Sequence, residues 1–173
     1  GELDQNGPVP GPMTLRRYLR QISGKTAALF RLACYQGARL SGCSPQQCRA
    51  AGDYGHFLGM GFQMQDDILD VVGDPKTTRK PAFEDLRNGV VNLPQLCAEA
   101  VDDGRLVALL AQRDDPRALQ AAGELIRATG VAPAQALADR YIDKALQRLG
   151  TLPNTPTRLA LETLTRRLVG RRD

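Results

Sequence analysis

Apolar side chains recur at three- or four-residue intervals along most of the chain, which is the spacing that buries one face of an α-helix. The first such stretch runs from Leu15 to Leu40. Thr14 is placed to cap its start, and Ser41 and Gly42 mark its end. The pattern therefore predicts a long helix close to the N-terminus of the sequence.

A second apolar stretch follows and is longer. It begins at Ser44-Pro45, a capping hydroxyl followed by a proline in the first turn, and runs through Val72 to a stop at Gly73. Residues 73–90 then contain two prolines and two glycines, which favours a long ordered loop with a helical turn over 82–87.

The rest of the chain also shows helical spacing, and no stretch alternates with period two over more than a few residues. We therefore expect an all-α fold, an antiparallel helix bundle. Residues 1–13 hold three prolines and three glycines and are interpreted as an irregular leading segment of one domain spanning 1–173. The remaining predicted helices cover 93–112, 116–129, 133–149 and 157–169.

Composition supports a globular domain of 173 residues, 42% hydrophobic and 24% charged. No apolar run approaches the roughly 20 residues that span a bilayer, and the first residues do not resemble a signal peptide, so we expect a cytoplasmic protein without a transmembrane segment. Aromatic residues make only 5% and tryptophan is absent, which argues against nucleic-acid binding. The four cysteines form no CxxC pair, and the single histidine, His56, is expected to have no catalytic role.

The strongest chemical signal is an acidic stripe on the second predicted helix. Gln63, Asp66, Asp67 and Asp70 fall at positions i, i+3, i+4 and i+7, so they share one face. Between residues 50 and 75 there is no Lys or Arg to neutralise the acids. Because their neighbours are apolar, we expect the acids to line a cavity in the bundle. Oxygen-only clusters suit Mg²⁺, which takes one or two carboxylates and shares its other positions with substrate phosphates.

Basic residues stand where a phosphate bound through that metal would need them. Lys25 and Thr26 lie on the first predicted helix, and Lys80 follows the acidic helix on a loop with Lys76 and Arg79. A lone lysine among apolar residues usually extends to solvent, and a basic loop is usually just solvated. Acids followed closely by lysines, however, can hold a phosphate between a metal ion and ammonium groups.

Several short motifs agree at once in order and spacing, and together they resemble the trans-polyprenyl diphosphate synthases. The match covers about residues 1–94. The resemblance implies the C-terminal half of an isoprenoid-synthase helix bundle, and a prenyltransferase that condenses an allylic diphosphate with isopentenyl diphosphate and releases pyrophosphate. The matching segments are Gly1-Glu2 with Gln5 and Tyr18, Lys25-Thr26-Ala27 with Leu29, Gly37-Ala38, Gly61-Phe62-Gln63, Asp66-Asp67, Asp70, Gly73-Asp74, Lys80-Pro81, Asp85-Leu86 and Leu93-Pro94.

The resemblance also implies roles for the charged residues. Asp66, Asp67 and Asp70 correspond to the second aspartate-rich motif of the family, which holds Mg²⁺ against the allylic diphosphate. Lys25 and Lys80 correspond to lysines that bind the same diphosphate and ease its departure. Such charges stabilise the transition state because ionisation creates a highly negative leaving group.

Uncharged residues take roles from the same resemblance. Thr26 and Gln63 correspond to polar groups near the developing allylic cation, and Phe62 corresponds to the aromatic residue beside the isopentenyl site. Two departures from the family pattern occur. Arg79 replaces the usual glycine before the loop lysine, and Val90 or Val91 stands where a lysine or polar residue is usual, which puts one diphosphate contact in doubt.

The first aspartate-rich motif of the family, with its arginines, does not occur in this sequence. Asp102-Asp103, on the helix predicted over 93–112, and Asp114-Asp115, at a helix start, are interpreted as surface features. We therefore expect a partner that carries the first motif, either the N-terminal half of the same polypeptide or a separate subunit. The sequence begins with Gly1 and not with an initiator methionine, which favours the first of these. We also expect a dimer.

Three alternative functions remain open at this point. The chain is a regulatory or non-catalytic subunit of a heteromeric polyprenyl diphosphate synthase, or a related terpene cyclase or head-to-head condensing enzyme, or an acidic helical adaptor without a substrate. The acidic stripe with both lysines argues against a purely structural subunit, because like charges held close together cost stability. Consumption of isopentenyl diphosphate separates a synthase from a cyclase.

Overall fold

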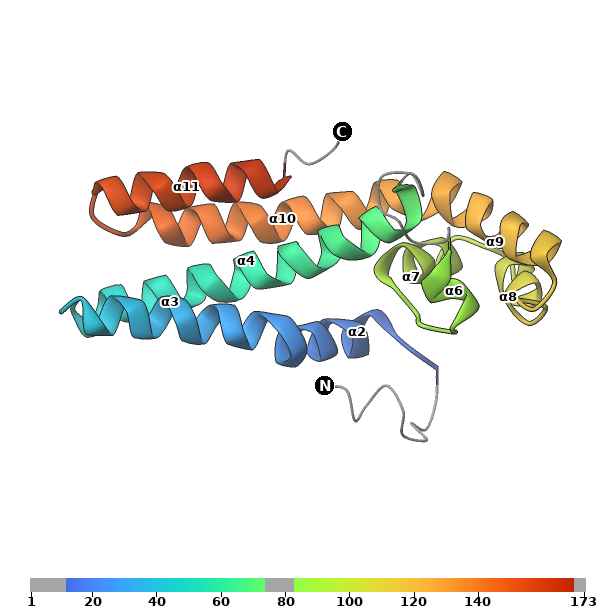
Figure 1. Cartoon of the computed structure of the whole chain (residues 1–173), viewed down its shortest axis with the longest axis horizontal. Helices are drawn as coiled ribbons and strands as arrows, with labels where there is room; N and C mark the ends of the chain where they lie inside the picture. The colour runs from blue at the N-terminus through green and yellow to red at the C-terminus, as the bar shows by residue number, and fades with distance from the viewer. Residues whose placement is uncertain (1–11, 74–82, 170–173) are drawn as a thin grey trace. The chain divides into compact units, whose positions relative to one another are not determined.

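The structure is a computed structural model that describes residues 12–73 and 83–169. Its regular elements in these ranges are all helices, so the all-α prediction is confirmed (Figure 1). One element, η1, is a π-helical turn. The bounds are α2 Leu15–Ile22, η1 Ser23–Ala27, α3 Ala28–Leu40, α4 Pro45–Val72, α6 Glu84–Arg87, α7 Leu93–Glu99, α8 Arg105–Leu110, α9 Pro116–Thr129, α10 Val131–Gly150 and α11 Pro156–Val169.

Capping side chains start the first two long helices where the sequence predicted. The amide of Arg17 donates to Thr14 Oγ1 at 3.3 Å before α2. Before α4, the Gln47 amide donates to Ser44 Oγ at 3.3 Å and the Ser44 amide donates to Gln47 Oε1 at 2.8 Å. This reciprocal pair satisfies two amides that the first turn leaves without helical partners. The predicted helix from Pro45 to Val72 is confirmed as α4.

One predicted helix, 93–112, was wrong, because the structure divides it into α7 and α8. Asp102 Oδ2 accepts hydrogen bonds from the amides of Gly104 and Leu106 at 3.0 and 2.7 Å. Gly104 has a φ of 101°, in the left-handed region that glycine tolerates best. Asp102 and Asp103 therefore lie in a turn and not on a helix.

The other predicted boundaries agree closely with the structure. Asp115 Oδ1 accepts from the Arg117 amide at 3.0 Å and starts α9. α6 supplies the helical turn expected near the end of the 73–90 loop. α10 starts at Val131, two residues earlier than predicted. Pro133 fits the first turn of a helix because amides in that turn have no partner within the helix, so the amide hydrogen that proline lacks is not needed there.

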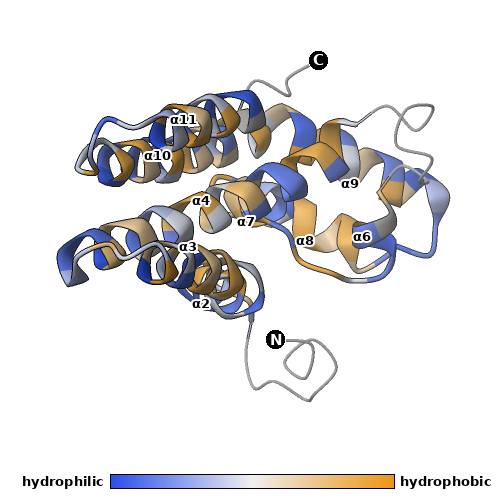
Figure 2. Ribbon diagram, turned by 60° about the vertical axis from the view of Figure 1, so that its left-hand side comes forward, coloured by the Kyte–Doolittle hydropathy of each residue, from blue (hydrophilic) through white to orange (hydrophobic). Residues whose placement is uncertain are grey.

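The chain divides into two compact units. The described residues of the first unit are 19–63 and 137–169, and those of the second are 12–18, 64–73 and 83–136. No linker separates the units in the described ranges, because the three boundaries there fall inside helices, in α2, α4 and α10. Each helix carries hydrophobic and hydrophilic residues, as Figure 2 shows.

Packing in the first unit joins α3, α4, α10 and α11. Gly55 and Gly59 let α3 approach α4, since a Cβ on Gly55 would meet the backbone carbonyl of Phe30. The Tyr54 hydroxyl hydrogen bonds to Thr165 Oγ1 at 2.9 Å inside this core. The buried cluster consists of Tyr54, Leu58, Ile142, Ala145 and Leu149.

The second unit has its own core, built from the end of α4 and from α6 to α9. Arg127 connects two of these elements, because its Nε donates to the Val71 carbonyl at 2.7 Å and its guanidinium lies 4.6 Å from the centroid of the Phe83 ring. Gly123 leaves room for that ring. The buried cluster consists of Val71, Phe83, Leu86, Ala98, Leu106, Leu119, Ala122 and Ile126.

Candidate active site

Lys25 and Thr26 lie on η1, which interrupts the run of α-helix between α2 and α3. A π-helical turn widens the backbone by one residue and is frequent at functional sites. Lys25 is exposed, whereas Ala27 is completely buried. Ala27 faces Gly59 of α4, where an added Cβ would come within 2.7 Å of the Ala27 Cα atom. The wide turn is therefore packed tightly on one side and open on the other.

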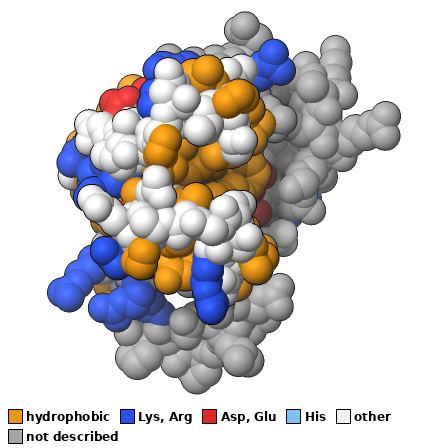
Figure 3. Space-filling view, turned by 90° about the vertical axis from the view of Figure 1, so that its left-hand side faces the viewer, with side chains coloured by type: hydrophobic (Ala, Val, Ile, Leu, Met, Phe, Trp, Pro, Cys, Tyr) orange, Lys and Arg blue, Asp and Glu red, His pale blue; other side chains and the backbone are white. Residues whose placement is uncertain are grey.

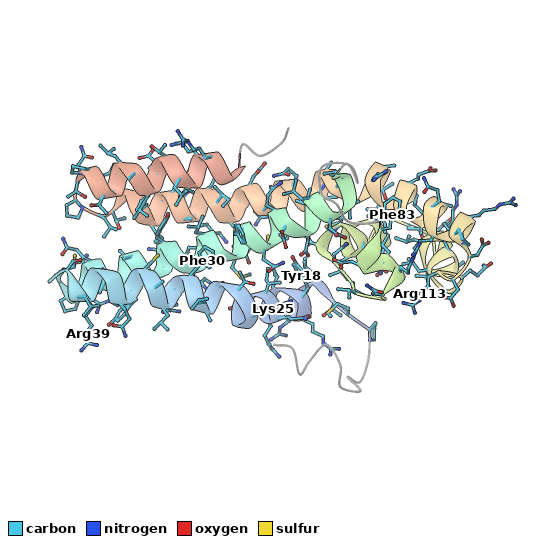
Figure 4. All side chains as sticks on the ribbon, viewed as in Figure 1. Tyr18, Lys25, Phe30, Arg39, Phe83 and Arg113 are labelled. Carbon is cyan, nitrogen blue, oxygen red and sulfur yellow. The ribbon has the colours of Figure 1, made fainter. Side chains whose placement is uncertain are left out.

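Thr26 reaches the acidic helix through a direct hydrogen bond. Its Oγ1 donates to Gln63 Oε1 at 2.7 Å. Phe62, the neighbour of Gln63, packs its ring against Phe30 with the centroids 5.6 Å apart, and Phe30 lies between α3 and α4 in Figure 4. The first unit thus brings Thr26 together with Gln63 and Phe62 together with Phe30, and it leaves Lys25 exposed.

The three acids belong to the second unit, on the continuation of the same helix. Asp66 is exposed, and Asp67 and Asp70 are half-buried. These exposures do not test the expectation that the acids line a cavity, which stays a prediction. In the described part of the chain, no three His, Cys, Asp or Glu side chains come close enough together to form a metal cage.

Asp67 is oriented by the backbone of a neighbouring helix. Its Oδ2 accepts a hydrogen bond from the Leu93 amide at 3.1 Å. Asn92 caps the same helix, α7, by accepting from the Gln95 amide at 3.0 Å. Leu93 is one of the first residues of α7, so its amide has no acceptor within the helix and is available to the carboxylate. The Leu93-Pro94 motif thus has a structural role, because the Leu93 amide orients the Asp67 carboxylate.

Tyr18 is a buried residue beside these acids, with only 3% of its surface exposed. Burial raises the pKa of its hydroxyl far above the usual range, and the nearby Asp67 carboxylate raises this pKa further. Cys97 and Asp66 contribute in the same direction. The hydroxyl therefore stays protonated and is available as a hydrogen-bond donor.

The predicted site residues are divided between the two units and a segment outside the described residues. Lys80 lies in that segment, 74–82, as do Lys76 and Arg79. Val90 is exposed and Val91 half-buried, in the stretch directly before α7. The first unit holds Lys25, Thr26, Phe62 and Gln63, and the second holds Asp66, Asp67 and Asp70.

His56 is half-buried, and the edge of its ring packs against Phe57 with centroids 5.4 Å apart. Burial lowers the pKa of His56, and the positive charge of Arg31 lowers it further, whereas Asp53 opposes this shift. His56 is therefore neutral near pH 7. These surroundings are those of a packing residue in the first unit.

Two contributors to this region were missed in the sequence. The π-helical turn leaves no mark in the apolar spacing, because Gly24 and Lys25 fit an ordinary helix pattern equally well. The contact between Asp67 and the Leu93 amide joins residues 26 positions apart and involves a backbone group. The Leu93-Pro94 motif was the one available signal for it.

Comparison with known proteins finds similarity to the polyprenyl synthetases. The model of the polyprenyl synthetase family matches residues 3–132. Heptaprenyl diphosphate synthase component 2 of Geobacillus stearothermophilus is 37% identical over 163 residues, which are 92% of this chain and 50% of that protein.

Solved structures agree with the sequence relatives. Geranylgeranyl pyrophosphate synthase from Lactobacillus brevis superposes with a TM-score of 0.80 at 42% identity, over 92% of this chain and 52% of that one. Polyprenyl synthase from Caulobacter crescentus, complexed with calcium and isoprenyl diphosphate, gives a TM-score of 0.84 at 35% identity, over 93% and 51%. This chain spans about half the length of the relatives it matches.

Proposed function

Because this chain belongs to the polyprenyl synthetase family, we propose that it supplies half of the active site of a trans-polyprenyl diphosphate synthase. The reaction would join an allylic diphosphate to isopentenyl diphosphate, with a longer polyprenyl diphosphate and pyrophosphate as products. The observation that carries the proposal is the order of polar residues on α4, where Gln63 bonds to Thr26 and Asp67 is oriented by a backbone amide.

The donor set fits Mg²⁺ held together with a diphosphate. All three acids offer carboxylate oxygens, and their arrangement on one helix face does not enclose an ion. Mg²⁺ commonly takes only one or two carboxylates and fills its other positions with water and phosphate oxygens. When bound, the ion would neutralise charge on the departing diphosphate. The Caulobacter crescentus polyprenyl synthase, complexed with calcium and isoprenyl diphosphate, supports this pairing of cation and diphosphate.

The chain's own residues would act on the substrate in three ways. The exposed Lys25 would bind a diphosphate oxygen and stabilise the charge that develops there. Thr26 holds the Gln63 amide oxygen, which would face the positive charge of the allylic group. Phe62, packed on Phe30, would give an apolar wall that keeps water from the cation. Lys80 would add a second ammonium group, as the family resemblance implies.

The partner would be the polypeptide that supplies the rest of the relatives' length, either joined to this chain or as a separate subunit. None of the 13 residues of α3 is buried, although several are apolar. Leu29, Leu32 and Leu40 share one face and are 68%, 54% and 88% exposed. Figure 3 shows hydrophobic side chains at the surface of the end of the molecule where α3 finishes. An apolar helix of that partner polypeptide would cover this face of α3.

The α3 face is tested by charge substitution in the assembled, active particle. Intact mass under denaturing conditions and native mass identify its polypeptides. Leu32→Glu should lower the share of chain recovered in the particle, because it places a charge in the contact. Leu159→Glu is the matched control, since Leu159 is 49% exposed on α11. If both variants assemble equally well, the α3 face is not the surface that binds the partner.

Catalysis is tested in the same particle by following isopentenyl diphosphate consumption and product length. Asp66→Asn combined with Asp67→Asn should reduce turnover at least about 100-fold, because charge stabilisation of the leaving group is lost. Asp114→Asn, an exposed acid in the turn before α9, is the matched control and should retain full turnover.

A second candidate function is a regulatory subunit of a heteromeric synthase. The name of the Geobacillus stearothermophilus relative, component 2, favours a two-component assembly. Unchanged turnover in the double Asp66 and Asp67 variant would support this regulatory role and refute the catalytic one. Activity without isopentenyl diphosphate would instead indicate a cyclase.

A further inference from the structure

Tyr18 combines deep burial with a hydroxyl that lacks a hydrogen-bond partner among the described residues. A buried hydroxyl without a partner costs free energy of folding, and phenylalanine would fill the same space without that cost. Tyr54 shows the usual solution, since it is buried to the same degree and its hydroxyl bonds to Thr165 at 2.9 Å. Packing alone therefore does not account for the hydroxyl of Tyr18.

The surroundings of Tyr18 indicate what the hydroxyl serves. Tyr18 lies on α2, where Figure 4 labels it, and it belongs to the same unit as the acidic part of α4. Asp67 is its strongest charged neighbour and a candidate acceptor, and Asp66 and Cys97 contribute more weakly. Burial raises the pKa of Cys97, so this thiol is neutral and a poor acceptor. The Asp67 carboxylate is therefore the acceptor that suits the Tyr18 hydroxyl best.

We propose that Tyr18 is a positioning residue, whose hydroxyl donates a hydrogen bond to the Asp67 carboxylate and holds it in the orientation that binds a cation with its diphosphate. The Leu93 amide already donates to Oδ2 of the same carboxylate. A carboxylate has about four lone-pair sites, so two donors from two helices would fix its plane and leave sites for the cation. This inference rests on the proposed function, since that function supplies the cation and the diphosphate.

The first test measures ligand binding by the 173-residue chain. Inorganic pyrophosphate is titrated in the presence of MgCl₂ by calorimetry, and thermal unfolding is recorded for each variant. Tyr18→Phe should weaken pyrophosphate binding about tenfold, which is typical of losing a group that orients a metal ligand. Its cooperative thermal unfolding should be retained, because the change removes one hydroxyl from the core, so weaker binding would not reflect loss of the fold.

Tyr54→Phe is the matched control, because it removes the hydroxyl of an equally buried tyrosine in the other unit. It should lower the unfolding temperature, since the bond to Thr165 is lost, and leave pyrophosphate binding unchanged. A Tyr18→Phe variant that binds pyrophosphate as tightly as the unmodified chain would overturn the inference and leave Tyr18 as a core residue.

A second measurement separates failure of this inference from failure of the proposed function. Tyr18→Phe, Asp67→Ala and the double variant form a thermodynamic cycle of unfolding in the absence of any ligand. Non-additive shifts would support the contact between Tyr18 and Asp67, and additive shifts would overturn it. If the cycle is coupled but the unmodified chain binds no pyrophosphate with Mg²⁺, the proposed diphosphate site fails while the contact stands.

Discussion

Arg127 offers a direct test of how the end of the acidic helix is held. Its Nε donates to the Val71 carbonyl at 2.7 Å, next to the last residue of α4, and its guanidinium lies 4.6 Å from the Phe83 ring centroid. The hydrogen bond from a charged donor contributes about 1.5 kcal/mol at this partly exposed position. The stacking contributes about 0.5 to 1 kcal/mol. Arg127→Gln should therefore lower the free energy of unfolding by about 2 kcal/mol.

A conservative variant separates the contribution of the positive charge from that of the planar guanidinium. Arg127→Lys keeps a positive charge near the C-terminal end of α4, which the helix dipole favours. It loses the planar guanidinium that both donates to Val71 and stacks on Phe83. We expect Arg127→Lys to lose less free energy of unfolding than Arg127→Gln, by the share that the retained charge contributes at the end of α4.

Equilibrium urea unfolding, followed by circular dichroism, gives the free energies from the midpoint and slope of each transition. Arg117→Gln is the matched control, because Arg117 is an exposed arginine near the start of the same helix, α9. It should change the free energy of unfolding by less than about 0.5 kcal/mol. If Arg127→Gln changes stability no more than Arg117→Gln, the two contacts contribute nothing and the reasoning is refuted.

Three further predictions follow from individual contacts. Thr26→Val removes the donor to Gln63 and should lower turnover of the assembled enzyme, whereas Thr26→Ser should retain it; equal turnover of both would contradict the role of the hydroxyl. Gly123→Ala places a methyl group against Phe83 and should destabilise the chain by about 1 to 3 kcal/mol in thermal unfolding. Because the folded chain holds the proton of Tyr18 while the unfolded chain releases it near pH 10, the free energy of unfolding should fall above about pH 10, and less steeply in Tyr18→Phe.

Helix boundaries set by short-range chemistry were predictable from the sequence. The start of α4 at Pro45 depends on Ser44 and Gln47, which lie within four residues of each other. The start of α9 depends on Asp115 in the same way. Such caps act through neighbouring amides only, so the sequence contains all the information they require.

Interruptions within a stretch of helical spacing were not predictable from that spacing. The residues of the 93–112 segment keep helical spacing, yet Asp102 and Gly104 favour a turn strongly enough to end α7. At η1 the apolar spacing of an ordinary helix continues, but the backbone widens where Ala27 packs on Gly59. In both places tertiary contacts or turn chemistry decide between conformations that the periodicity alone leaves equivalent.

In the candidate site, too, the features set by nearby residues were predictable and the contacts with distant residues were not. The stripe from Gln63 to Asp70 follows from helical periodicity and needed no structure. The partners of that stripe come from distant parts of the chain, as the bonds from Thr26 to Gln63 and from Leu93 to Asp67 show. The family resemblance anticipated that Thr26 and Gln63 act near one another, because it assigned both to the same region of the substrate.

The acidic stripe also indicates how ligand binding should act on stability. No Lys or Arg occurs between residues 50 and 75, so the mutual repulsion of Asp66, Asp67 and Asp70 is not relieved within α4 itself. A backbone amide on Asp67 satisfies one acceptor but adds no full positive charge. Under the proposed function a cation with its diphosphate supplies that charge, and at 100 times its dissociation constant a ligand stabilises the folded state by about 2.7 kcal/mol. Repulsion among acids of one helix face would therefore weaken when a cation binds, and this relief would add to the affinity for the cation.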